Sequence, residues 1–281
     1  FKWVARLTGS KNAVKGLGFL LGAGLLAGIG FEAALLSMAA VLAAILIGVV
    51  VAMPGGLPAG KKGIPFSAVF SKDRRVNLLS AARVFLFGAR DVWFVVGIPI
   101  YFYEVLSTTA GMTTREAFMA VGGFMGVWIV GYGVIQTLAP RALRAEGRSL
   151  AETAGLASGW VALLAAIPAA LAVLAYLSGA PSTWLTVALI VGLLVFGVVF
   201  AVNSSLHSYL ILAFSERERV TMDVGFYYMS NAGGRLLGTL LSGLSYQLLG
   251  LPGCLAIASV MAGLSWVWAL SLKRAALAVP A

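Results

Sequence analysis

Long apolar segments with few charges dominate this sequence and limit the structures that it can form. Of the 281 residues, 60% are hydrophobic and 11% are charged, whereas a typical soluble domain is about 25% charged. Eight segments approach or exceed the roughly 20 residues that a helix needs to cross a bilayer. They cover residues 14–29, 33–53, 77–106, 117–139, 154–178, 183–213, 222–249 and 252–272. Since a helix satisfies its own backbone hydrogen bonds in lipid, the predicted fold class is all-α, a polytopic membrane protein with eight transmembrane helices.

The basic residues are distributed unevenly between alternate loops. One set of loops holds 16 lysines and arginines, and the opposite set holds only Arg115. Cytoplasmic loops of membrane proteins carry the excess of Lys and Arg. The pattern therefore predicts a multi-pass protein of the cell (inner) membrane with both ends of this chain in the cytoplasm. The net charge of +10 is assigned to these loops, so we expect the lipid bilayer and no nucleic acid as a partner.

A loop rich in glycine and proline, residues 54–76, divides the chain. Two apolar segments precede it and six follow it. Many transporters are built from repeated groups of helices. We therefore interpret residues 1–53 as the last two helices of an N-terminal lobe, 54–76 as a cytoplasmic inter-lobe loop, and 77–281 as a six-helix C-terminal lobe. On this interpretation four further helices precede Phe1 in the intact protein.

Charged residues occur inside two of the apolar segments. Arg83, Arg90 and Asp91 lie within 77–106, and Arg235 lies within 222–249. Each such charge costs roughly 2.5–3.5 kcal/mol on insertion scales, so it usually faces a partner or a cavity. Arg90 and Arg235 are both thirteen residues into their segments, about 20 Å along a helix axis and close to the membrane midplane. Their matched depth predicts one shared site.

The residue types favour an anion as the ligand of that site. A guanidinium offers paired donors in one plane to phosphate or carboxylate. We expect Arg90 and Arg235 to clamp the anion and Arg83, which shares a helix face with Arg90, to guide it inward. Asn231 and Asn203 are further candidates for substrate binding, although Asn203 either contacts a neighbouring helix or lines a water-filled path.

Asp91 is the acid closest to these arginines in sequence. Adjacent residues point about 100° apart on a helix, so Asp91 is not expected to pair with Arg90. At least one deep arginine would then lack a partner, which favours a substrate site over structural pairing. Asp91 is the candidate for a coupling proton or for steadying one arginine.

Glycine spacing marks two helix faces. Gly18, Gly22, Gly24 and Gly28 are expected to form a flat packing face, with a pivot between lobes as the alternative. Gly234, Gly238 and Ser242 recur every four residues and predict a second close helix contact beside Arg235.

Other chemistry has little support in the sequence. The single cysteine, Cys254, and the single histidine, His207, exclude an internal disulfide and a histidine-rich metal site. No pattern of paired acids or of a nucleophile beside a base is found. We therefore expect no enzyme, no catalytic residue and no cofactor. His207 is expected to be packed or interfacial, and a membrane-embedded lipid enzyme is the alternative from another class.

Three stretches, NAVKGLGFLLG, AARVFLFGARDVWFVVGIPIYFYE and DVGFYYMSNAGGRLLGTLLSGL, resemble permeases of the major facilitator superfamily, and most closely the organoarsenical efflux permeases of the ArsJ type. The resemblance implies a twelve-helix fold in which this chain supplies the fifth to twelfth helices. It also implies a secondary transporter that exports 1-arseno-3-phosphoglycerate, a small anionic substrate supplied by glyceraldehyde-3-phosphate dehydrogenase as the functional partner. A transporter for another anion or drug, and a fragment that does not transport, are the alternatives.

Overall fold

The computed structural model describes residues 2–53, 70–143, 147–216 and 218–278, and only the backbone of residues 2–13. Every regular element in these ranges is a helix, so the all-α class is confirmed. The elements are α1 (Lys2–Ile29), α2 (Phe31–Ala52), α3 (Arg74–Val92), η2 (Trp93–Gly97), α4 (Ile98–Glu104), η3 (Val105–Thr109), α5 (Thr114–Ala142), α6 (Leu150–Ser178), α7 (Thr183–Phe214) and α8 (Val220–Leu277). The predicted inter-lobe loop falls mostly on residues 54–69, which lie outside the described residues.

The apolar helices are long enough for a membrane protein. Within the described ranges, six helices have the length and composition to cross a bilayer, and residues 14–29 form a shorter apolar helix. One of the six runs from residue 74 to 109 and includes two π-helical turns, η2 and η3. The coarse prediction of a helical membrane protein is thus supported, while the count of eight spans stays a prediction.

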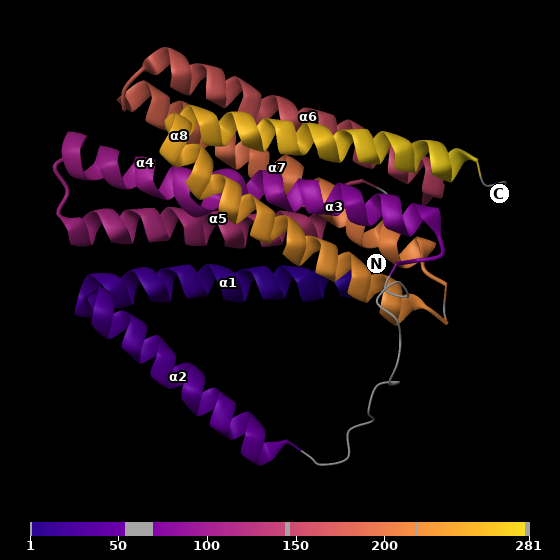
Figure 1. Ribbon diagram of the computed structural model, residues 1–281, viewed down its shortest axis with the longest axis horizontal. Coiled ribbons are helices and arrows are strands. Elements are labelled where there is room, and N and C mark those ends of the chain that lie inside the picture. The colour runs from indigo at the N-terminus through magenta and orange to yellow at the C-terminus, as the bar shows by residue number, and fades with distance from the viewer. Residues whose placement is uncertain (1, 54–69, 144–146, 217, 279–281) are drawn as a thin grey trace.

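α8 contains a sharp reversal at Gly250. This residue has φ 64° and ψ −158°, a backbone conformation that is essentially restricted to glycine. Figure 1 shows α8 as two arms that diverge from this point. Across the turn, the Ser245 hydroxyl donates to the Cys254 sulfur at 3.2 Å. The predicted segments 222–249 and 252–272 correspond to the two arms.

The helix ends gather at two opposite ends of the bundle (Figure 1). One end holds the start of α3, the end of α5, the start of α6, the end of α7 and both termini of α8. We call it the basic end, because most of the loop cations that the structure describes lie there: Lys72, Arg74, Arg75, Arg141, Arg148, Arg219, Lys273 and Arg274. Arg115 lies at the start of α5, at the other end. The separation of charge seen in the sequence is therefore also a separation in space.

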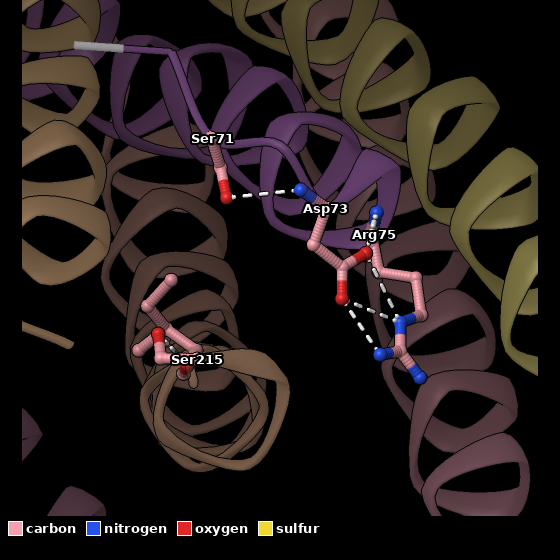
Figure 2. A network of polar contacts seen from close by, with 5 residues as sticks. Ser71, Asp73, Arg75 and Ser215 are labelled. Atoms are coloured by element: carbon pink, nitrogen blue, oxygen red, sulfur yellow. Dashed lines mark hydrogen bonds and ion pairs between the residues drawn. The ribbon is translucent and has the colours of Figure 1, made fainter. Parts of the chain in front are cut away.

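Polar contacts at the basic end fix the start of α3 (Figure 2). The Asp73 carboxylate accepts from the Arg75 amide at 2.7 Å and from the Arg75 guanidinium at 2.6 Å. The Ser71 hydroxyl accepts from the Asp73 amide at 3.2 Å. An acidic N-cap satisfies backbone donors that the helix leaves open. α3 consequently begins three residues before the predicted apolar segment.

α1 packs along α5, whereas α2 diverges from the bundle (Figure 1). A Cβ placed on Gly16 would overlap Val130, and a Cβ placed on Gly122 would overlap Ala23. No heavy atom lies within 4 Å of the corresponding position at Gly18, Gly22, Gly24 or Gly28 in the described structure. α1 instead turns the side of Gly16 and Ala23 toward α5, and the packing face of the other four glycines stays a prediction.

Candidate anion-binding site

Close packing of α8 on α3 positions the candidate site. A Cβ on Gly234 would overlap the carbonyl of Val84, and a Cβ on Gly238 would lie 2.7 Å from the carbonyl oxygen of Gly88. One turn further on, the Ser242 hydroxyl accepts from the Val96 amide at 3.2 Å. The predicted ridge of small residues is confirmed. Because the backbones approach this closely, Arg235 on α8 lies beside Asp91 on α3.

Asp91 bridges the two midplane arginines. Its Oδ1 accepts from Arg90 Nε at 2.6 Å and lies 2.5 Å from a terminal nitrogen of Arg90. Its Oδ2 accepts from Arg235 Nε at 3.0 Å. We call Arg90, Asp91 and Arg235 the charged triad. The structure thus brings together Arg90 and Arg235, which the sequence places at equal depth, and the carboxylate of Asp91 connects them.

The prediction that Arg90 and Asp91 would not pair was wrong. The guanidinium of Arg90 lies 5.1 Å from the ring centre of Phe87, 5.8 Å from that of Phe94 and 5.6 Å from that of Phe200. These rings stabilise the cation by their faces but accept no strong hydrogen bond. The long arginine side chain therefore folds back to the carboxylate of its own neighbour. The direction in which a side chain leaves the helix does not determine where the guanidinium of a long, flexible arginine lies.

The triad has a buried side and an open side. The side chains of Asp91 and Arg90 are 1% and 7% exposed, whereas that of Arg235 is 48% exposed. A buried ion pair requires compensation of both charges, and two cations against one carboxylate leave a net charge of +1. Of the three guanidinium nitrogens of Arg235, only Nε has a hydrogen-bond partner within the described residues. The terminal nitrogens of Arg235 are thus placed to bind an anion.

A cavity of about 620 Å³ lies in front of the triad. Its size is within the range of pockets that bind small molecules. Arg90, Asp91 and Arg235 form part of its lining, and Lys15 from α1 adds a further cation. Lys15 was counted among the loop charges, although it lies at the start of the predicted apolar segment 14–29, which was the available signal. Three cations against one acid give this cavity a positive potential.

A π-helical turn follows the triad directly. η2 (Trp93–Gly97) interrupts the α-helix two residues after Asp91. Single π-turns inside α-helices are frequent at functional sites. Phe94 and Val95 of this turn line the cavity. The ring of Phe94 also packs against Phe19, Trp93 and Trp128, so Phe94 combines a packing role with a place in the cavity wall.

Arg83 lies apart from the cavity lining. It is buried, and its guanidinium donates to the Ser204 hydroxyl on α7 at 3.1 Å. The same guanidinium stacks 4.0 Å from the ring centre of Phe87 and 4.7 Å from that of Tyr227. No carboxylate pairs with it among the described residues. Arg83 and Arg90 both lie against the ring of Phe87, so they share one face of α3, as their seven-residue spacing predicts. Only Arg90 lines the cavity.

The remaining polar candidates are not brought together with the triad. Asn203 is buried and donates to the Ala157 carbonyl on α6 at 3.2 Å, which is the helix-contact alternative of its two interpretations. Asn231 is half-buried, and its amide oxygen has no hydrogen-bond partner in the described structure. His207 is fully buried, and neither ring nitrogen has a partner in the same ranges. His207 is therefore packed rather than interfacial.

Neither a scan against protein-family models nor a search of the curated proteins finds a match for this chain. Among the described residues, no group of three or more His, Cys, Asp or Glu side chains is arranged to hold a metal ion. The functional argument therefore rests on the geometry of the charged triad and its cavity, and the family resemblance stays a prediction.

Proposed function

We propose that this chain belongs to a secondary transporter that moves a small organic anion across a membrane by alternating access. The observation that carries the proposal is the charged triad on the wall of a 620 Å³ cavity. Charges buried at membrane depth are expensive and commonly mark a substrate pathway. A cavity with an excess of cations selects an anion.

The triad suggests how such an anion would be bound and released. The carboxylate of Asp91 accepts from Nε at one edge of the Arg235 guanidinium and restricts its position at the cavity wall. A phosphate or carboxylate of the substrate would take the two terminal nitrogens, which form the geometry that suits these groups. Asp91 at the same time lowers the net charge of the site, so the anion is held less tightly than by two bare arginines. Moderate affinity allows release on the far side.

For the substrate, we propose 1-arseno-3-phosphoglycerate, produced in the cytoplasm by glyceraldehyde-3-phosphate dehydrogenase. This choice rests on the resemblance to organoarsenical efflux permeases of the major facilitator superfamily. The substrate carries a phosphate and an arsenate ester, and the cations of the cavity complement both. The same proposal places the protein in the inner membrane as part of a twelve-helix fold with two lobes, and gives it a role in arsenate resistance.

The test uses the intact protein in cells that make the conjugate. Replacement of Arg235 by Ala or Lys, or of Arg90 by Ala or Lys, should abolish arsenate resistance and raise cellular arsenic at unchanged membrane protein levels. Arg141→Ala, which removes an exposed cation outside the cavity lining, is the matched control. Normal arsenate resistance in the Arg235 variants would show that the charged triad does not bind the substrate.

A second measurement separates the substrate from the site. Uptake of 3-phosphoglycerate into inverted vesicles reports anion transport without arsenic. Uptake that requires Arg235, without any arsenate resistance in cells, would support an anion transporter and contradict the arsenic conjugate as substrate.

The apolar part of the cavity supports a second candidate, a transporter for a larger amphipathic anion such as an acidic drug. Phe19, Phe94 and Phe118 line the cavity beside the cations. Aromatic surface of this kind binds apolar groups that a phosphorylated three-carbon acid lacks. Competition between an aromatic carboxylate and 3-phosphoglycerate in the vesicles would identify the preferred class.

A further inference from the structure

A second concave site lies at the basic end, between α6 and the second arm of α8. This groove has a volume of about 700 Å³. Its lining includes Arg148 and Lys273 together with Trp160, Leu163 and Leu277. It shares no residue with the lining of the central cavity. The groove therefore needs an explanation of its own.

The cations of the groove are available to a ligand. Arg148 is exposed, and its Nε donates to the Leu143 carbonyl at 3.1 Å, which leaves its terminal nitrogens available to a ligand. Lys273 is exposed and makes no hydrogen bond or ion pair with any residue that the structure describes. Both cations line the groove and are exposed, so a negatively charged group can reach them.

The one acid in the lining, Glu152, is already engaged. Its carboxylate accepts from the Ser149 backbone amide at 2.8 Å and so closes the capping box of α6. In the described ranges it forms no ion pair within 4 Å of Arg148 or Lys273. Two cations and one occupied acid leave the groove lining with a net charge of +1. The groove is therefore complementary to an anion.

The remainder of the groove is apolar and open. Leu163 is half exposed, and Leu277 is also exposed, although both are large aliphatic residues. A Cβ placed on Gly159 would meet no heavy atom within 4 Å in the described structure, so this glycine leaves the floor hollow. The lining residues from 149 to 163 on α6 cover about 21 Å of helix, more than the roughly 15 Å of one leaflet. A ligand with a charged head and a long apolar tail fits this order of features.

We propose that the groove binds an anionic phospholipid. The phosphate of the head group lies between Arg148 and Lys273, and Trp160, about 18 Å further along α6, lies beside the acyl chains. One acyl chain runs along Gly159 and Leu163 in the hollow. The proposal does not depend on the charged triad or on the identity of the transported anion.

The test measures lipid binding to the purified intact protein by native mass spectrometry, with phosphatidylglycerol as the anionic probe and phosphatidylcholine as the zwitterionic one. The wild type should retain phosphatidylglycerol preferentially. The double variant Arg148→Ala/Lys273→Ala should lose roughly 25-fold in affinity for phosphatidylglycerol, because each basic residue near a lipid surface contributes about fivefold. The matched control Arg141→Ala/Arg274→Ala removes the same charge from the same end but outside the groove.

Two further arms test the position and the kind of ligand. Gly159→Leu fills the hollow without meeting another atom at its Cβ, and it should reduce binding of phosphatidylglycerol while leaving the fold intact. Inorganic phosphate in tenfold excess over the lipid should not displace it. An equal loss in the control double variant, full binding by Gly159→Leu, or displacement by inorganic phosphate would each overturn the proposal.

Discussion

Asp91 on α3 accepts a hydrogen bond from Arg235 on α8 at 3.0 Å, although the two residues are 144 positions apart in the sequence. The same carboxylate holds Arg90, its neighbour. One acid thus links two helices at the depth where a membrane protein can least tolerate an unpaired charge. It also connects a mostly buried cation, Arg90, to a half-exposed one, Arg235, on the wall of the same cavity.

We expect Asp91→Asn to destabilise the protein strongly. The variant leaves Arg90 buried without a counter-charge, and removal of one partner from a buried pair typically costs about 3–5 kcal/mol. Thermal unfolding of the detergent-purified protein would measure the loss. Asp73→Asn is the control, because the Asp73–Arg75 pair is partly exposed and should contribute about 1 kcal/mol. Equal shifts in the two variants would contradict the bridging role.

Replacement of Arg235 should separate binding from folding. Its side chain is 48% exposed, so Arg235→Gln should change the unfolding temperature little. The loss of a charge-assisted hydrogen bond of about 1.5–3 kcal/mol should nevertheless weaken anion binding by about 10- to 100-fold. Uptake into vesicles across a range of 3-phosphoglycerate concentrations would measure it. An unchanged half-saturation concentration would exclude contact between Arg235 and the anion.

A single methyl group at the contact between α3 and α8 should be enough to disturb the triad. Gly234→Ala directs its Cβ into the backbone of Val84, and overpacking of this kind typically costs about 1–3 kcal/mol. Because the helices must separate, the contact between Arg235 and Asp91 should weaken and transport should fall. Gly233→Ala is the matched control, since nothing in the described structure lies within 4 Å of its Cβ position. Thermal unfolding and uptake should both distinguish the two variants.

The reversal in α8 should depend on glycine. Gly250→Ala forces a side chain into a backbone region that is essentially restricted to glycine, at a cost of about 1–3 kcal/mol. Gly243→Ala, in a helical part of α8 with open space at its Cβ, should be neutral or slightly stabilising. Unfolding midpoints of the two alanine variants would test this difference, and a neutral Gly250→Ala would contradict the strain.

Regular periodicities made part of the site predictable. Arg90 and Arg235 were matched by counting residues from the same end, which works because every residue of an α-helix adds a constant rise. The ridge of Gly234, Gly238 and Ser242 was predicted for a similar reason, since residues four apart share a face. Both arguments depend on the backbone alone. They require of the side chains only that those of the ridge are small and those of the matched pair are charged, not any particular conformation.

Features that depend on side-chain conformation were not predictable. Arg90 turns toward Asp91 because aromatic rings from α3, η2 and α7 surround it, and no local rule brings those rings together. Arg83 binds Ser204, 121 residues away, for which the sequence contains no signal. Lys15 joins the cavity only because α1 lies against α5. Each case requires the tertiary arrangement first.

The π-turn η2 sets the phase between the two halves of the long helix that contains the triad. A π-turn holds one more residue than the α-helical turn that it replaces. Deletion of Val95 would therefore restore a regular α-helix as far as Glu104, before η3, and rotate everything beyond position 95 relative to Asp91. Tyr101, which now meets Thr186 at 3.2 Å, would face another direction. The extra residue thus works as a spacer that lets one continuous helix present its charges to the cavity and, further along, its aromatic rings to a different neighbour.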